Sequence, residues 1–172
     1  MKKGFTLVEL LIVIVIIGAL ATLVLPGLLN NYEKAIKKIM ITQENIVNDA
    51  ASLAVKDYCN SPLNKEKLAK CNYSDTHKDG LIRSGKETVD GKEVTYYYTC
   101  LNILNDLGYY DGEMIYDTSS NTSCRAYTEF QKIDGKYVKP KTYAYCNSDA
   151  YEYDYVTEGA KADGRYNNCL NY

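Results

Sequence analysis

An apolar run near the N-terminus constrains this 172-residue chain more than any other feature. Residues 5–25 contain one charged side chain, Glu9. About 20 helical residues cross the hydrocarbon core of a bilayer, whereas the apolar part of a secretory signal peptide has roughly 7–15 residues. Lys2 and Lys3 precede the run, and basic residues favour the cytoplasmic side. The sequence therefore predicts a single-pass membrane anchor, with its N-terminus in the cytoplasm and the remaining chain outside.

Glu9 does not fit a plain anchor. A carboxylate at the centre of a spanning helix costs about 2.5–3.5 kcal/mol, and an acid within a membrane usually marks a function with a partner. Glu9 lies about 6 Å along a helix from Phe5. Cleavage between Gly4 and Phe5 would create an α-amine that pairs with Glu9 of a neighbouring, axially shifted subunit. The sequence therefore predicts a role for Glu9 in assembly.

The residues KKGFTLVE, from Lys2 to Glu9, resemble the prepilin cleavage and methylation motif of type IV pilins and pseudopilins. The resemblance implies cleavage after Gly4 by a prepilin peptidase, N-methylation of Phe5 and docking through Glu9. Pro26 falls where family members often carry a helix-breaking proline, which implies a kink. The implied partners are other pilin subunits in a homopolymer or mixed filament, the peptidase and methyltransferase, the membrane before assembly, and the pilus assembly machinery.

The function that this resemblance implies is a type IV pilus subunit serving adhesion, motility or DNA uptake. Such a subunit passes from the inner or cytoplasmic membrane into an extracellular filament. The alternative is a pseudopilin of a type II secretion or competence system, which shares the N-terminal region. A third interpretation is a monomeric, surface-anchored binding module that keeps residues 1–4.

Other function classes find little support in the sequence. The net charge of -2 gives no indication of a nucleic-acid partner. The single histidine, His77, lies in a turn-rich stretch without a serine-nucleophile motif. Phosphate-loop and dinucleotide motifs are absent from the sequence. We therefore expect neither an enzyme nor a cofactor.

The helical pattern continues beyond the apolar run. Apolar residues recur at three-to-four-residue spacing from Leu28 to Tyr58, which predicts an amphipathic helix. They drift from a strict heptad, which favours packing against a sheet over a coiled coil. The predicted divisions are a leader (1–4), a transmembrane and filament-core helix (5–25), an amphipathic second half (26–58), a helix-to-sheet connector (59–92) and a disulfide-rich sheet head (93–172).

The head has the pattern of an antiparallel sheet, so the predicted fold class is α+β, with the second half of the long helix against the sheet. Strand-like runs cover residues 93–99, 125–133, 136–146 and 151–157. Asp134-Gly135 predicts a two-residue hairpin turn, and Pro140 predicts an edge or a bulge. Short helices are predicted at 64–70 and at 101–107, the latter ended by Gly108.

Six cysteines in a small extracellular head predict disulfides. They are Cys59, Cys71, Cys100, Cys124, Cys146 and Cys169. Six cysteines allow 15 pairings, of which sequential pairing (59–71, 100–124 and 146–169) is our expectation. Structural zinc is the alternative, but the sequence has no C-x-x-C pair and only one histidine.

Two further ligand sites remain open alternatives. The acidic and amide-rich tail could bind calcium, although it has no spaced calcium-loop motif. Its residues are Asp149, Asp154, Asp163, Asn167 and Asn168. The chain has 18 tyrosines and no tryptophan. We expect these tyrosines mainly to pack in the core and on the surface, with a ligand-binding patch as the alternative.

Overall fold

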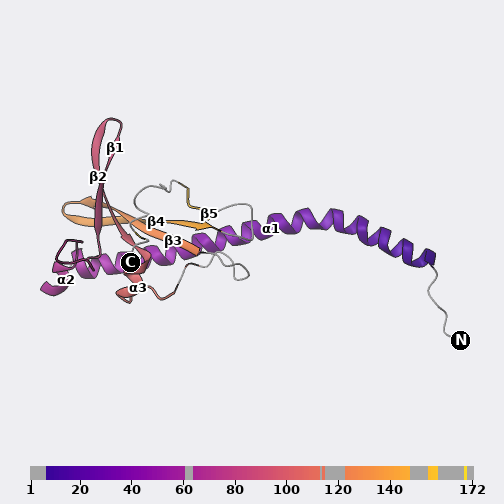
Figure 1. Ribbon diagram of the computed structural model, residues 1–172, viewed down its shortest axis with the longest axis horizontal. Helices are drawn as coiled ribbons and strands as arrows, with labels where there is room; N and C mark the ends of the chain where they lie inside the picture. The colour runs from indigo at the N-terminus through magenta and orange to yellow at the C-terminus, as the bar shows by residue number, and fades with distance from the viewer. Residues whose placement is uncertain are drawn as a thin grey trace. The chain divides into compact units, whose positions relative to one another are not determined.

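The computed structural model describes residues 7–60, 64–112, 114, 123–147, 155–158 and 169. The chain forms two compact units, Met1–Lys38 and Ile39–Tyr172. The secondary-structure elements are shown in Figure 1. They confirm the predicted α+β class: a long N-terminal helix followed by an antiparallel sheet.

The long helix α1 runs over Leu7–Val55 and continues into a π-helical turn, η1, at Lys56–Asn60. Pro26 lies inside α1 and does not end it. A proline removes one backbone hydrogen bond from a helix, and the remaining turns of this 49-residue helix keep the chain helical on both sides. The predicted helix therefore forms, whereas a local break at Pro26 does not. The kink at Pro26 stays a prediction.

Within the second unit, α1 buries a narrower stripe than its apolar pattern predicts. The buried helical residues there are Met40, Val47, Ala50, Ala51, Ala54 and Val55. Ile39, Ile46 and Leu53, which the pattern placed on the same stripe, are 53%, 52% and 55% exposed. Three of the six buried residues are alanines, whose small side chains allow a close approach to the helix.

The sheet has five strands in the order β1-β2-β3-β4-β5, and every neighbouring pair is antiparallel. The strands are β1 Arg83–Val89, β2 Lys92–Cys100, β3 Ser123–Ile133, β4 Lys136–Asn147 and β5 Tyr155–Val156. Of the last predicted strand, residues 151–154 lie outside the described residues.

Strand β1 corrects the predicted connector at 59–92, because the sheet begins at Arg83. A Ser-Gly pair such as Ser84-Gly85 is typical of turns, but Gly85 is a strand residue opposite Tyr96. A Cβ atom at Gly85 would collide with the Tyr96 hydroxyl oxygen, so the tyrosine occupies the space that a side chain at position 85 would need. The turn between β1 and β2 is Asp90-Gly91, with φ angles of 51° and 76°. Positive φ at both central residues is typical of a type I′ hairpin turn.

The β3–β4 hairpin confirms both predictions made for it. Asp134 and Gly135 have φ angles of 49° and 78° and form the turn. Gln131 pairs with Val138, whereas Glu129 pairs with Lys141. Two residues of β4, Lys139 and Pro140, therefore stand opposite one residue of β3, which is a β-bulge. Lys139 has a φ of 52°, a conformation that bulges accommodate.

Both short helices form where they were predicted. Helix α2 covers Lys65–Ala69, and the Asn64 side chain caps it by accepting a 2.8 Å hydrogen bond from the Glu66 N–H. Helix α3 covers Leu101–Asp106 and is followed by Gly108 at a φ of 74°. Between the two helices lie the strands β1 and β2, so α3 connects the end of β2 to the segment that leads to β3.

One face of the sheet carries small buried side chains toward α1. The Thr142 hydroxyl donates a 2.9 Å hydrogen bond to the Asn48 side-chain oxygen of α1. Thr142 and Thr128 share a 2.8 Å hydroxyl contact. The Thr157 hydroxyl donates to the Glu44 carboxylate. These polar contacts fix which turns of the helix meet β4 and the end of β5.

The opposite face of the sheet carries tyrosines. Tyr98 and Tyr127 are buried and meet edge to face at 6.2 Å between ring centroids. Tyr127 also stacks on Tyr143 at 5.2 Å. At least these tyrosines act as core residues, which agrees with the packing role expected from a chain without tryptophan.

Candidate assembly segment and disulfide-tied head

The predicted assembly residues lie at and before the start of α1. Gly4 and Phe5 lie outside the described residues, so their cleavage and methylation stay predictions. Glu9 lies in the first turns of α1 with an exposed side chain. A carboxylate near a helix N-terminus interacts favourably with the helix dipole, typically by about 0.3–1 kcal/mol. The helix dipole therefore favours an acid at position 9 even within a single subunit. The prediction from the sequence rested on pairing between subunits alone.

The first part of α1 presents an apolar surface. The large apolar side chains between Leu7 and Leu20 are 45% to 79% exposed. An apolar surface of this extent is typical of an interaction site. Among the described residues, no helix combines the length and apolar character needed to cross a membrane.

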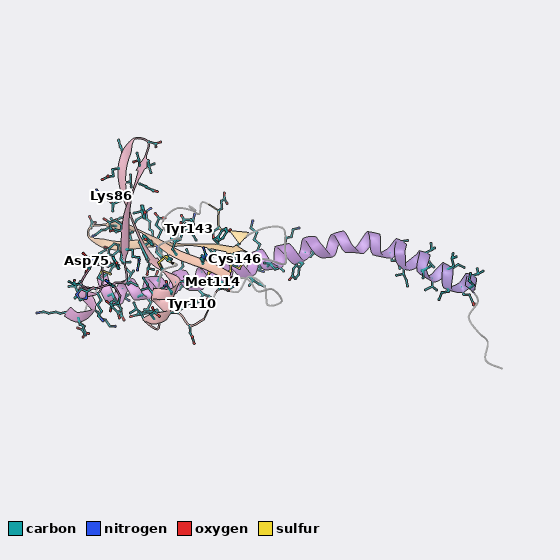
Figure 2. All side chains as sticks on the ribbon, viewed as in Figure 1. Asp75, Lys86, Tyr110, Met114, Tyr143 and Cys146 are labelled. Carbon is teal, nitrogen blue, oxygen red and sulfur yellow. A yellow bond between two sulfur atoms is a disulfide. The ribbon has the colours of Figure 1, made fainter. Side chains whose placement is uncertain are left out.

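All six cysteines form disulfides, with the pairs Cys59–Cys71, Cys100–Cys169 and Cys124–Cys146. The first pair was predicted, whereas the predicted pairs 100–124 and 146–169 are wrong. Figure 2 labels Cys146 on β4. Cys124 is its direct partner on β3, and their Cα atoms are 4.1 Å apart. Cysteines that face each other in a strand pair are close enough to bond without moving the backbone.

The bulge at Lys139 and Pro140 decides this pairing. Next to the turn, Ile133 pairs with Lys136, and an unbroken register would place Cys124 opposite Tyr145. The extra residue in β4 shifts the register by one, so that Cys124 faces Cys146 instead. The cysteine pairing therefore depends on a backbone irregularity that spacing alone does not reveal.

Cys100 pairs with a cysteine near the C-terminus. It ends β2, is fully buried and precedes the first residue of α3. Its Cα atom lies 5.4 Å from that of Cys169. The disulfide therefore ties Cys169 to the junction of β2 and α3.

A polar cluster joins η1, α2 and the segment after α3. The Asp57 carboxylate accepts a 2.6 Å hydrogen bond from the Tyr109 hydroxyl and a 2.9 Å one from the Lys67 ammonium. The hydrogen bond from Tyr109, and then that from Lys67, hold the pKa of Asp57 below its usual value. Burial and the bond to Asp57 raise the pKa of Tyr109 to about 12.

No metal site appears among the described residues, where no three or more His, Cys, Asp or Glu side chains come together. The acidic tail residues proposed for calcium lie outside these residues. His77 belongs to a tight turn, in which its N–H donates a 3.1 Å hydrogen bond to the Ser74 hydroxyl. The six cysteine sulfurs are all in disulfides, so none of them is a thiolate that could bind zinc in this structure.

Comparison with known proteins bears on the N-terminal segment first. A family model described as the prokaryotic N-terminal methylation motif matches residues 1–25. The chain therefore begins with a prepilin-type methylation motif. No solved structure matches the chain.

Several curated relatives resemble part of this chain. Type II secretion system core protein G of Escherichia coli (strain K12) is 39% identical over 67 residues, which is 39% of this chain and 46% of the relative. The protein of that name from Pectobacterium carotovorum subsp. carotovorum is 36% identical over 95 residues, 55% of this chain and 53% of the relative. The one from Dickeya chrysanthemi is 57% identical over 37 residues, 22% of this chain and 24% of the relative.

The chain spans about half or less of the length of these relatives. Their shared name supports the type II secretion alternative better than the type IV pilus interpretation of the sequence. A pilin-like role agrees with both.

Proposed function

We propose that this protein is a pseudopilin, a structural subunit of a filament in a type II secretion system. In this proposal the chain is cleaved after Gly4, methylated at Phe5, and assembled with other pilin-like subunits through α1. The observation that carries the proposal is the methylation motif over residues 1–25, followed by relatives that all carry a type II secretion name.

The apolar surface of α1 supports assembly through the helix. Exposed leucine, isoleucine and valine side chains fill residues 7–20, where Glu9 is the single charge. Subunits that pack these surfaces together remove them from water, which gains free energy in proportion to the apolar area buried. A carboxylate brought into that apolar surface needs a cationic partner, and the α-amine of a processed Phe5 supplies one.

The second half of α1 offers a further packing surface. Ile39, Ile46 and Leu53 repeat every seven residues and are all about half exposed. A seven-residue apolar repeat is the spacing at which helices pack along each other. We propose that neighbouring subunits cover these side chains in the filament.

The proposal includes a location. The subunit would be held in the inner membrane by its N-terminal segment until it enters the filament, with the disulfide-bonded head on the oxidising side. Disulfides form in extracellular and periplasmic compartments, and all six cysteines are paired. A prepilin peptidase and the assembly machinery would be its partners.

The role of Glu9 is tested with the Glu9→Ala variant in cells that contain the assembly machinery. We expect normal cleavage after Gly4 but about tenfold less protein in the sheared filament fraction, which corresponds to ~1.4 kcal/mol per subunit. Glu158→Ala removes an exposed acid of the head and serves as the matched control, with wild-type incorporation expected. Equal incorporation of Glu9→Ala and the wild type would show that the pairing is not used.

Mass spectrometry of the filament fraction tests the processing. We expect a chain that begins at N-methyl-Phe5. A mature chain that keeps Met1 and occurs only as a monomer would favour the surface-anchored binding module. Filaments that extend from the cell without any effect of their loss on protein secretion would favour the type IV pilus interpretation.

A further inference from the structure

Strands β1 and β2 form an arm, residues 84–96, that extends beyond the rest of the sheet. Only residues 97–100 of β2 pair with β3, whereas residues 92–96 pair with β1 alone. Figure 1 shows the β1–β2 hairpin standing away from β3 and β4. The arm is therefore a two-stranded ribbon with one open edge on β1 and another on β2.

The strand register shows which backbone groups of the arm face outward. The two-residue turn at 90–91 makes Val89 and Lys92 a hydrogen-bonded pair. Hydrogen-bonded and non-hydrogen-bonded pairs alternate along an antiparallel ladder. Every second residue therefore points its N–H and C=O groups away from the partner strand. These residues are Ser84, Lys86 and Thr88 on β1, and Glu93 and Thr95 on β2.

Both edges of the arm are open to another strand. All five outward-facing residues are exposed. Within the part of the chain that the structure describes, no backbone hydrogen bond from another segment reaches either edge. An exposed strand edge is a template for pairing with another chain, and a hairpin of two strands is only marginally stable by itself. Pairing at these edges would therefore stabilise the arm.

The charges of the arm restrict the partner. Figure 2 labels Lys86 on the arm, and its ammonium donates a 2.6 Å hydrogen bond to the Glu93 carboxylate on the neighbouring strand. A lysine on an open edge disfavours pairing with an arbitrary strand. Two β1 edges paired about their midpoint would place Lys86 opposite a second Lys86, and like charges in that position are destabilising. The β2 edge carries Glu93, so it fits the β1 edge of another copy better.

Two copies with aligned arms satisfy strand direction, hydrogen bonding and charge together. Because β1 and β2 are antiparallel, the β2 edge of one copy meets the β1 edge of the next in antiparallel orientation. With the hairpin tips level, Thr95 faces Lys86 of the next copy and Glu93 faces Thr88. All four residues then point their backbone groups at each other. Glu93 lies diagonal to Lys86 of the next copy, within reach of its long side chain.

We propose that the β2 edge of one subunit's arm pairs with the β1 edge of the next subunit's arm, so that the arms form a continuous antiparallel sheet along the filament. This contact joins two different surfaces of identical subunits. Contacts of that kind continue from copy to copy and generate helical filaments when they do not close into a ring. The inference rests on the proposed filament function and adds a contact between heads to the packing of α1.

Cysteine cross-linking in filaments tests this contact. One chain carries Lys86→Cys, and a second chain, marked by a peptide tag, carries Thr95→Cys. Both are produced in the same cells, which contain the assembly machinery. The Cα atoms of a hydrogen-bonded antiparallel pair are about 5.5 Å apart, a separation that a disulfide spans. We expect a mixed dimer after the sheared filaments are oxidised with diamide.

The two cysteines are placed on separate chains because Lys86 and Thr95 of one chain also face each other. Cells that produce only the Lys86→Cys chain, or only the Thr95→Cys chain, should give no dimer, since the contact joins different edges. Lys136→Cys, next to the exposed β3–β4 turn, is the matched control for Lys86→Cys. It should give no mixed dimer with Thr95→Cys.

A proline on the β1 edge tests whether backbone pairing makes the contact. Thr88→Pro, added to the Lys86→Cys chain, removes an outward N–H and leaves the bonds between β1 and β2 in place. We expect about tenfold less mixed dimer, as for the loss of one well-made hydrogen bond. Thr88→Val keeps the N–H and should cross-link like the parent chain. Both variants should enter filaments in the parent amount, which reports that they fold.

The outcomes separate the arm contact from the filament function. Filaments that contain both chains but give no mixed dimer would overturn the arm contact and leave the filament function intact. A dimer from one kind of chain alone, or an unchanged yield with Thr88→Pro, would overturn the pairing of these two edges. Absence of the wild-type chain from any filament would remove the filament function and this inference with it.

Discussion

Asp57 shows how a single side chain can connect three segments of this protein. One oxygen of its carboxylate accepts hydrogen bonds from Tyr109 and from Lys67, which come from the segment after α3 and from α2. The Tyr58 ring meets Tyr109 edge to face at 6.1 Å, and the Lys67 ammonium lies 5.2 Å from the Tyr58 ring centroid. Sequence patterns did not indicate this cluster, because its members are distant in the chain and each is an ordinary surface residue type.

The Tyr109→Phe variant should unfold more easily than the wild type, by about 1 kcal/mol at neutral pH, because it lacks one hydrogen bond. The pKa of Tyr109 rises from 10.0 to about 12 on folding. A raised pKa of this kind stabilises the fold fully below pH 10, and that contribution is lost as the pH rises toward 12. Thermal melts at increasing pH should therefore show the two proteins converging.

Tyr110→Phe is the control for this experiment, because burial alone raises the pKa of Tyr110 and no bond to a carboxylate contributes. A Tyr109→Phe difference that stays constant from neutral pH to pH 12 would contradict the role assigned to the bond to Asp57. At the acid end, the lowered pKa of Asp57 makes its contribution present above pH 3.8 and lost as the pH falls through its folded value.

Among the elements, the β3–β4 hairpin shows how a β-bulge determines which residues of the two strands can form a disulfide. The two-residue turn fixes the register at Ile133 and Lys136, and the bulge then moves β4 by one residue. A one-residue shift in a strand exchanges its two faces. The bulge therefore decides which β4 side chains face α1 and whether Cys146 meets Cys124.

Two deletions in β4 test whether the Cys124–Cys146 disulfide requires the bulge itself or only the strand register. Removing Lys139 alone leaves Pro140 opposite Phe130, so Cys124 should still meet Cys146 and no free thiol should appear. Removing Lys139 and Pro140 together should place Cys124 opposite Asn147, so that this disulfide fails to form. Alkylation followed by mass spectrometry counts the free thiols, with none expected in the first variant and two in the second. Free thiols in both variants would show that the bulge itself, rather than the register, is required.

Features that depend on one residue or its neighbours could be predicted from the sequence, whereas features that depend on residues distant in the chain could not. The hairpin turn at Asp134-Gly135 and the bulge at Pro140 depend on the conformations of single residues, and the structure confirms both. The strand β1 was missed because Gly85 looks like a turn residue until Tyr96 is known to lie over it. The pairs 100–169 and 124–146 could not be read from spacing, because they depend on the register and on the path of the C-terminal chain.

The same distinction applies to the candidate sites. The assembly motif is a contiguous set of residues, so Gly4, Phe5 and Glu9 were recognisable from the sequence, although their roles remain predictions. By contrast, a pocket lined by Asn102 of α3 and Arg125 of β3 was not recognisable, because these residues come to one cavity only in the folded chain. Asparagine and arginine are common surface residues, and their spacing in the chain carries no signal for a site.

For the molecule as a whole, the three disulfides should contribute unequally to stability. Cys100 and Cys169 are 69 residues apart, whereas Cys59 and Cys71 are 12 apart. Loop-entropy arguments give about 4 kcal/mol for the longer loop and about 3 kcal/mol for the shorter one. The disulfide that closes the longer loop also includes a fully buried residue, Cys100.

Replacing each pair by serines tests this order. The Cys100→Ser/Cys169→Ser protein should have the lower urea midpoint of the two double variants, measured by the circular dichroism of the sheet at constant pH. Reduction of the wild-type protein should lower the midpoint further than either double variant does. An equal or larger loss in Cys59→Ser/Cys71→Ser would contradict the loop-length argument, and no change on reduction would contradict a structural role for all three bonds.

The strand order has a consequence for how the head is made. Because β1 to β5 lie side by side in the order of the chain, each strand finds its neighbour already synthesised, and the contacts between successive strands are short in sequence. Proteins rich in such contacts fold quickly. Cys100 is different, because its partner Cys169 lies 69 residues further along the chain. The Cys100 thiol therefore waits longer for its native partner than the thiols of Cys59 and Cys124, whose partners follow after 12 and 22 residues.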